Sequence, residues 1–371
     1  MSEIYIGLMS GTSLDGVDGV LADFSSPFPQ VLGHVSAPFS ADLRQELLAL
    51  NSSGADELHR AALAGNALAR VYASVVAQLL DTAPCHRQAV RAIGAHGQTV
   101  RHRPGQFDGT GYTLQLNQAA LLAELAGIDV VADFRSRDVA AGGQGAPLVP
   151  PFHQALFGHL PGKSAVLNVG GISNITLLHQ QQPNTLLGFD CGPGNALMDA
   201  WCRQHTGRAY DDKGQWAAAG TAHVELLQHL LAEPFLALAP PKSTGRDLFN
   251  SAWLKDRFIG FEGLSATDIQ ATLTELTARS CADCVAQFAP GTQRLLVCGG
   301  GVLNDFLMGR LASLLPACTV SSTGKYGVPP MQVEALAFAW LARQCIQRKT
   351  ASHKSVTGAQ GARILGAIYP A

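Results

Sequence analysis

The 371-residue sequence predicts an α/β fold in which one βββαβαβ architecture occurs twice. Residues 4–39 and residues 165–190 each show an apolar strand, a turn rich in Gly, Ser, Asn or Asp, and two further strands. Helical and strand patterns alternate after each triplet, as they do in α/β domains. The composition, 47% hydrophobic and 15% charged, supplies a large core and is not that of a disordered chain.

The first half contains the first copy of this pattern. The apolar spacing predicts strands over residues 4–24 (two strands and their turn), 31–39, 92–96 and 128–132, and helices over 42–50, 56–80 and 117–126. A Gly- and Pro-rich loop over 140–151 then predicts a boundary or hinge. We therefore expect one domain over 1–140 and a second over 141–349, and leave open whether residues 350–371 pack back on the first.

The second half repeats the order. Strands are expected over 165–178 (two strands around a turn), 186–190, 295–298 and 319–320. Helices are expected over 196–205, 216–231, 267–288, 303–315 and 331–345. Two stacked copies of one architecture would place their glycine turns opposite each other across a cleft.

Charge and composition exclude several classes of partner. The net charge of −2 gives no electrostatic case for nucleic acid or an anionic membrane. No basic leader and no apolar run of about 18 residues is seen, so we expect a cytoplasmic protein that is neither secreted nor membrane-spanning. The eight cysteines are scattered, as in a reduced protein, and the Cys281-x-x-Cys284 pair has no second pair at zinc-site spacing.

The turn from Gly11 to Asp18 favours binding of phosphate and metal. Its glycines let the backbone approach a ligand, and successive N–H groups form an anion site. Ser10, Thr12 and Ser13 add hydroxyl donors, and Asp15 and Asp18 could hold a hydrated Mg²⁺. A plain hairpin turn uses the same residue types, so this alternative stays open.

Three more glycine-rich strand ends follow in the second half. They are 168–174 (Asn-Val-Gly-Gly-Ile-Ser-Asn), 189–195 (Phe-Asp-Cys-Gly-Pro-Gly-Asn) and 298–304 (Cys-Gly-Gly-Gly-Val-Leu-Asn). Glycines there let a nucleotide lie on the backbone, and a following helix N-terminus favours phosphate. Together with the first turn, they indicate a nucleotide-binding kinase or ATPase. The Gly162-Lys163-Ser164 triplet is no Walker A loop, because Phe157 stands where the first glycine belongs and the triplet precedes a strand.

Four side chains are candidates for the chemistry. Asp190 ends a buried strand beside two glycines, and we favour a general base over a helix cap, because Asn195 is better placed to cap. Arg135 could hold an anionic substrate group or form a surface ion pair with Asp133 or Asp138. His96 could bind a sugar or be a satisfied buried histidine, and Glu334 could bind a ligand or simply favour its helix N-terminus.

The chain as a whole resembles the anhydro-N-acetylmuramic acid kinase family, within the actin, hexokinase and heat-shock chaperone superfamily. The resemblance runs nearly end to end, through the segments 7–18, 95–100, 133–135, 142–148, 168–174, 189–195, 241–246 and 298–301. One departure is Cys191, where many members have Thr. The resemblance implies two actin-like (ribonuclease H-like) domains around an ATP cleft, and a cytoplasmic enzyme of peptidoglycan recycling that is usually a dimer.

The resemblance also implies a reaction and its residues. ATP, Mg²⁺ and water would convert 1,6-anhydro-N-acetylmuramic acid to N-acetylmuramic acid 6-phosphate, with Asp190 activating the water. ATP and metal would lie on Gly11, Thr12, Ser13, Leu14, Asp15, Gly16, Val17 and Asp18, with Asn168, Gly170, Gly171, Asn174, Gly299 and Gly300 as further nucleotide contacts, and His96, Arg135 and Glu334 would hold the sugar. Two alternatives remain: a kinase for another anhydrosugar such as levoglucosan, and a non-kinase ATPase of the same fold.

Overall fold

The computed structural model describes residues 3–11, 14–83, 85–178, 186–245 and 248–371. The chain divides into two compact units. The first unit combines Met1–Phe152 with Gln332–Ala371, and the second comprises His153–Met331. This division differs from the boundary expected after residue 140, and it assigns residues 332–349 to the first unit.

The first unit is built on a sheet in the order β13-β7-β4-β1-β2-β3. Its strands are β1 (Ile4–Met9), β2 (Gly16–Asp23), β3 (Gln30–Pro38), β4 (Val90–Ala95), β7 (Val130–Ala132) and β13 (Ala367–Tyr369), with a separate hairpin of β5 (Gln98–Pro104) and β6 (Gly111–Leu116). Its helices are α1 (Ala41–Ala49), α2 (Glu57–Thr82), α3 (Ala119–Ala126), α4 (Ser136–Ala140), α13 (Val333–Ile346) and α14 (Lys354–Thr357). Helix α5 (Pro150–Phe157) crosses the boundary between the units.

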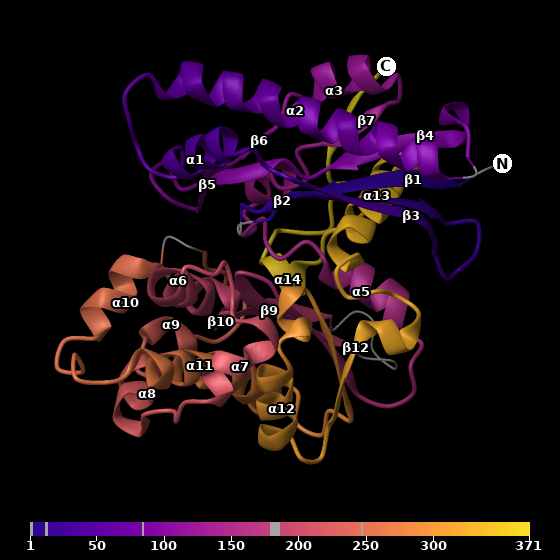
Figure 1. The fold of residues 1–371 in the computed structure, drawn as a ribbon. Coiled ribbons are helices and arrows are strands. Elements are labelled where there is room, and N and C mark those ends of the chain that lie inside the picture. The colour runs from indigo at the N-terminus through magenta and orange to yellow at the C-terminus, as the bar shows by residue number, and fades with distance from the viewer. Residues whose placement is uncertain (1–2, 12–13, 84, 179–185, 246–247) are drawn as a thin grey trace. The chain divides into compact units, whose positions relative to one another are not determined.

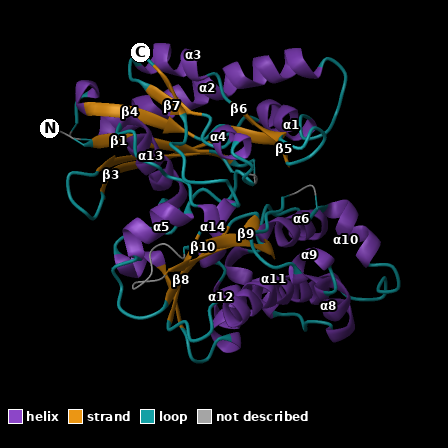
Figure 2. Cartoon of the chain, turned by 180° about the vertical axis from the view of Figure 1, so that it is seen from behind, coloured by secondary structure: helices purple, strands orange, loops and turns teal. Residues whose placement is uncertain are grey.

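The second unit is built on a sheet in the order β10-β9-β8-β11-β12. Its strands are β8 (Ser164–Val169), β9 (Ile172–Leu178), β10 (Leu187–Pro193), β11 (Arg294–Cys298) and β12 (Thr319–Ser322). Its helices are α6 (Asn195–Thr206), α7 (Gln215–Ala218), α8 (Val224–Leu231), α9 (Pro234–Ala237), α10 (Ser251–Arg257), α11 (Ala266–Phe288) and α12 (Asp305–Leu314) (Figure 2).

Apart from the added edge strand β13, the two sheets have the same topology. In each, the first two pairings are antiparallel, β1 with β2 with β3 and β8 with β9 with β10. In each, the first strand also pairs in parallel with the fourth, which pairs in parallel with the fifth, β1-β4-β7 and β8-β11-β12. This agreement confirms the predicted duplication of an α/β architecture.

Helix α13 packs against the first sheet because two glycines make room for it. Gly7 and Gly94 are paired in the parallel register of β1 and β4. A Cβ on Gly7 would lie 1.8 Å from the Ala335 carbonyl oxygen, and one on Gly94 would lie 2.1 Å from the Phe338 carbonyl oxygen. The helix backbone therefore rests directly on the strands, which is the physical reason that this late segment belongs to the first unit.

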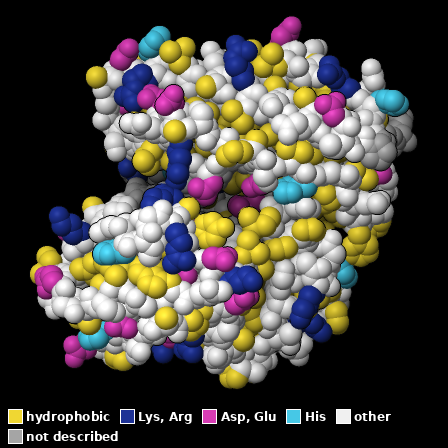
Figure 3. Space-filling model, viewed as in Figure 1, with side chains coloured by type: hydrophobic (Ala, Val, Ile, Leu, Met, Phe, Trp, Pro, Cys, Tyr) yellow, Lys and Arg dark blue, Asp and Glu magenta, His cyan; other side chains and the backbone are white. Residues whose placement is uncertain are grey.

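Each core lies between a sheet and its helices. In the first unit α2 packs on β2 and β3 of the sheet (Figure 1), and its Leu68, Tyr72 and Val76 belong to one buried cluster with Ile6 and Leu8 of β1. Among the described residues, α2 is the one helix long and apolar enough to span a membrane, and its buried face packs in this core. In the second unit α11 and α12 cover one face of the sheet, through Leu273, Leu276 and Leu311 among others. Figure 3 shows basic and acidic side chains interspersed over the visible surface.

Three local predictions were wrong or incomplete. The helix expected over 216–231 is two helices, α7 and α8, because Gly220 meets the Thr267 backbone and His223 accepts the Leu226 N–H to begin α8. Asn195 does not cap α6, since its amide donates to the Val169 carbonyl at 3.0 Å. The hairpin β5–β6 lies in a segment for which no element was expected.

Candidate active site

The first unit gathers polar residues where three strands end. Because β1, β4 and β7 are parallel, their carboxyl ends share one edge of the sheet. Ser10 follows β1, His96 follows β4, and Arg135 lies three residues beyond β7. Hydrogen bonds link the His96 side chain to the Arg135 side chain and to the Ser10 backbone carbonyl, so residues that are far apart in the sequence form one cluster.

His96 lies at the centre of this cluster. Its Nε2 is 2.9 Å from Arg135 Nη2, and its Nδ1 is 3.3 Å from the Ser10 carbonyl oxygen. Arginine can only donate, so Nε2 must accept, and Nδ1 carries the proton and donates to Ser10. Burial, with the charge of Arg135 as a second cause, lowers the pKa of His96 to about 3. His96 is therefore a neutral ring whose tautomer is set by its neighbours.

Arg135 is held from two sides. Besides His96, its Nη1 donates to the Gly145 carbonyl at 2.7 Å. Asp138, one of the two ion-pair partners considered for Arg135, accepts hydrogen bonds from the Gly145 N–H and from the Thr357 hydroxyl. Arg135 is partly exposed as a residue, and its guanidinium, held from two sides, is suited to an anionic ligand.

The turn after β1 is tied to the same cluster. Ser10 Oγ lies 2.8 Å from the Tyr72 hydroxyl and donates to the Gly97 carbonyl, and Gln98 donates to the Gly11 carbonyl. Leu14 closes the turn by donating its N–H to Gly11. Thr12 and Ser13 lie outside the described residues. The sequence did not identify Tyr72 as a site residue, because its spacing in α2 is that of an ordinary core position.

Several predicted phosphate-loop residues lie in β2 instead. Val17 is a core residue, and a Cβ on Gly16 would lie 2.2 Å from the Ala37 carbonyl oxygen, so both have packing roles. Asp18 accepts from Ser36 and lies 3.4 Å from His34, both on β3. Asp15 is exposed and 3.7 Å from Arg44 of α1. The Asp15 side chain is 69% exposed and the Asp18 side chain is 38% exposed, so Asp15 is the more open of the two carboxylates.

Glu334 lies in the first turn of α13 and is partly exposed. Its helix contacts the His96 ring through Phe338, at 4.7 Å between ring centroids. The element that carries Glu334 thus packs directly against the His96 cluster.

The second unit brings its glycine turns together at the corresponding sheet edge. Asn195 and Ala196 donate backbone N–H groups to Gly170 and Gly171. Gly299 has φ +79°, and a Cβ there would lie 2.4 Å from Asn168 Oδ1. The start of α6, the turn after β8 and the turn after β11 therefore form one glycine-lined surface, which also includes Gly300.

Asp190 is part of a polar row across this sheet. Asp190 pairs with Asn174, which pairs with Asn168, so the three side chains share one face. Asp190 is only 8% exposed, and its Oδ2 accepts from the Thr244 N–H at 2.8 Å. The Oδ1 atoms of Asn168 and Asn174 are buried and have no hydrogen-bond partner among the described residues. Buried acceptors of this kind need a donor, which a bound ligand or water would supply.

Two sets of contacts beside Asp190, those of Lys242 and those of Cys191, could not be predicted from residue types. The Lys242 carbonyl accepts the Asp190 N–H, and the Lys242 ammonium donates to the Phe235 and Leu236 carbonyls. On the opposite face, Cys191 contacts Cys281 and Cys284 in the core. The sequence signal for the Lys242 contact was the Pro-Lys-Ser-Thr-Gly-Arg segment at 241–246. Because this segment lies far from Asp190 in the sequence, the contact between them could not be predicted.

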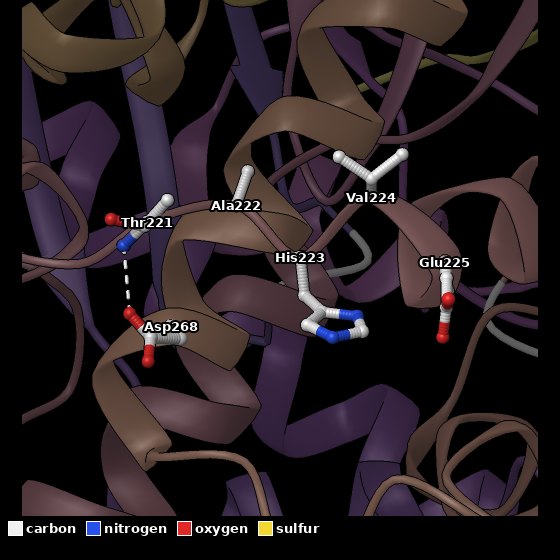
Figure 4. Close-up of a pocket in the computed structure, with 6 residues that line it drawn as sticks. All are labelled: Thr221, Ala222, His223, Val224, Glu225 and Asp268. Carbon is white, nitrogen blue, oxygen red and sulfur yellow. Dashed lines mark hydrogen bonds between the residues drawn. The ribbon is translucent and has the colours of Figure 1, made fainter.

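A separate open pocket of about 390 Å³ lies in the second unit (Figure 4). Its lining is Thr221, Ala222, His223, Val224, Glu225 and Asp268. Asp268 accepts from the Thr221 N–H at 2.7 Å, and His223 caps α8. The Asp268 and His223 side chains thus satisfy local backbone groups, and none of the predicted site residues lines this pocket.

Comparison with known proteins assigns the chain to a family. The family model described as anhydro-N-acetylmuramic acid kinase matches residues 3–371. Relatives with that name are 62% identical in Albidiferax ferrireducens, over the whole of both chains, and 59% identical in Variovorax paradoxus, over 100% of this chain and 99% of the relative. A solved activator of 2-hydroxyisocaproyl-CoA dehydratase from Clostridium difficile overlaps 93% of this chain and 96% of its own, with 12% identity and a TM-score of 0.48. On the family model and the relatives, the chain belongs to the anhydro-N-acetylmuramic acid kinase family.

Proposed function

We propose that this protein uses ATP and water to open 1,6-anhydro-N-acetylmuramic acid and to phosphorylate its O6, giving N-acetylmuramic acid 6-phosphate. The observation that carries this proposal is the family match over residues 3–371. Relatives named for this kinase cover the whole chain at 57–62% identity. This similarity favours neither a levoglucosan kinase nor a non-kinase ATPase. We further propose a cytoplasmic homodimer that acts in peptidoglycan recycling.

Asp190 is proposed as the general base. The anhydro bridge leaves no free O6 hydroxyl, so a water must attack the anomeric carbon and O6 must leave. A buried carboxylate fixed by the Thr244 N–H can orient that water and accept its proton. The Asn174 Oδ1, which has no hydrogen-bond partner among the described residues, lies beside it in the polar row and offers a second acceptor.

The sugar is proposed to bind near Arg135 and Glu334. The substrate carries a lactyl carboxylate, and a fixed guanidinium is the side chain best suited to a carboxylate. Both ring nitrogens of His96 are engaged, so we place its contribution in orienting Arg135.

ATP is proposed to bind through the glycine-lined turns. The set comprises Gly11, Thr12, Ser13, Leu14, Asp15, Gly16, Val17 and Asp18 in the first unit and Asn168, Gly170, Gly171, Asn174, Gly299 and Gly300 in the second. Gly16 and Val17 would contribute only backbone, since both pack in the sheet. Mg²⁺ would be held by Asp15 and Asp18 and would neutralise phosphate charge. No group of three or more His, Cys, Asp or Glu in the described part of the chain forms a dedicated metal cage, which is the usual situation for Mg²⁺ on a nucleotide.

Asp190→Asn tests the proposed mechanism. The amide keeps the shape and can still accept the Thr244 N–H but cannot take a proton, so we expect both substrates to bind and turnover to fall about 10²–10⁴-fold. The wild-type reaction in ¹⁸O-water should label the anomeric hydroxyl and leave the phosphate unlabelled. Mass spectrometry of the sugar phosphate reads both results.

A matched control is Asp256→Asn, an exposed position on α10 of the same unit. It should retain wild-type turnover. Label in the phosphate, or near-normal turnover by Asp190→Asn, would assign this carboxylate another role.

A further inference from the structure

The proposed sugar-binding arginine depends on a contact between two distant segments. Residues 141–149 form a glycine- and proline-rich loop after α4, and α14 lies more than 200 residues later in the chain. The side chain of Asp138 joins them. Its Oδ2 accepts the Gly145 N–H, and its Oδ1 accepts the Thr357 hydroxyl, each at 2.8 Å.

The backbone strengthens the same junction. Gln144 donates its N–H to the Thr357 carbonyl at 2.7 Å, and Gln360 donates to the Ala141 carbonyl at 2.9 Å. A Cβ on Gly143 would lie 2.2 Å from Asp138 Oδ2, so the loop passes directly over this carboxylate. Asp138 is fully buried, and burial raises its pKa against the effect of its two donors.

The junction determines where Arg135 points. Gly145 donates to Asp138 through its N–H and accepts Arg135 Nη1 through its carbonyl at 2.7 Å. The other side of the guanidinium rests on His96, which is fixed by Ser10. A continuous series of hydrogen bonds therefore runs from Thr357 through Asp138, Gly145 and Arg135 to His96.

We propose that Asp138 and Thr357 are positioning residues that fix Gly145 and thereby aim the Arg135 guanidinium at the carboxylate of the sugar substrate. This inference rests on the proposed function. An arginine with several rotatable bonds binds a carboxylate more tightly when its orientation is set in advance. The α14 segment thus acts on substrate selection through Asp138, Gly145 and Arg135.

Thr357→Val is the sharpest test, because it removes one hydroxyl and keeps the side-chain shape. Asp138→Ala would strand the Gly145 N–H and Thr357 together and would mainly unfold the loop. For Thr357→Val we expect KM for anhydro-N-acetylmuramic acid to rise about tenfold, as the loss of one buried hydrogen bond allows. KM for ATP should stay unchanged, and Thr357→Ser, which restores the hydroxyl, should return the sugar KM to within about twofold of wild type.

Two controls separate positioning from general destabilisation. Thr292→Val removes another buried hydroxyl, bonded to the Ala289 carbonyl in the second unit, and should leave both KM values unchanged. Calorimetry with 1,6-anhydro-N-acetylglucosamine, which lacks the lactyl carboxylate, should show equal affinity for wild type and Thr357→Val. A selective loss for the carboxylate sugar supports the proposal, and an equal loss for both sugars overturns it.

Arg135→Ala separates a failure of the positioning role from a failure of the proposed function. If wild type phosphorylates the muramic sugar and Arg135→Ala loses affinity for it while Thr357→Val does not, the positioning role fails and the proposed function stands. If the wild-type protein does not phosphorylate the muramic sugar, the proposed function fails, and the positioning role fails with it. An Arg135→Ala variant of normal sugar affinity overturns both the arginine's role and that of the residues behind it.

Discussion

At the residue scale, burial decides what the histidines of this protein can do. His96 and His153 are both buried, and burial lowers the pKa of each to about 3. Neither ring titrates near neutral pH in the folded state, so neither acts as a proton shuttle there. His96 instead serves as a neutral acceptor for Arg135, and His153 lies 2.8 Å from the Thr176 hydroxyl through Nδ1.

These depressed pKa values predict acid sensitivity. Below about pH 6.5 the unfolded chain protonates these histidines and the folded chain does not, so stability is complete above that pH and falls toward pH 3. His153→Gln should reduce the loss of unfolding free energy between pH 7 and pH 5 by about 2 kcal/mol. Urea unfolding of wild type and variant at pH 7 and at pH 5 measures this loss of unfolding free energy.

His229→Gln is the control, because this histidine is exposed on α8 of the same unit. It should retain the pH dependence of the wild type. A His153→Gln variant whose stability falls as steeply as that of the wild type would mean that the buried ring is not the source.

At the element scale, α13 shows how two small residues can place a helix. Its sequence predicts a buried apolar helix and nothing about its partner. The Gly7 and Gly94 pair gives the helix backbone direct access to β1 and β4. Phe338 then packs on both His96 and Phe134, which connects the helix to the candidate site.

Gly94→Ala should therefore displace α13. The added methyl would overlap the Phe338 carbonyl, a backbone atom that no rotamer change can move, so we expect a loss of about 3 kcal/mol or more in unfolding free energy. Gly33→Ala on β3 is the matched strand control, because its Cβ would meet no atom closer than 3.5 Å. Chemical denaturation of both variants measures the difference, and equal stability would contradict the packing argument.

At the scale of the whole molecule, the last residues of the chain complete the first unit. Residues 332–371 return to that unit, where β13 pairs with β7 and α14 joins Asp138. The second unit is a continuous segment, His153–Met331, with its own core. The two units therefore differ in what they require to fold.

Expressed fragments test this difference. We expect residues 153–331 alone to unfold cooperatively on heating, because their core is complete. Residues 1–152 alone should not, because Gly7 and Gly94 then expose the sheet face that α13 covers. Joining residues 332–371 to residue 152 by a Gly/Ser linker should restore cooperative melting by circular dichroism. A cooperative transition in residues 1–152 alone would refute the need for α13.

By itself, the sequence determined the duplicated α/β architecture, because alternating and helical periodicities depend only on local spacing. It also located the glycine turns, His96 and Arg135 after strands, and its motifs identified the family. Asp190, expected at the end of a strand over 186–190, lies instead within β10, which continues to Pro193 because it stays paired with β9. Only the tertiary structure decided which of these side chains meet. His96 takes its tautomer from Arg135, and Asp138 and Thr357 are bonded although 219 positions separate them. Contacts between distant segments depend on how sheets and helices pack in three dimensions, and no local pattern in the sequence encodes them.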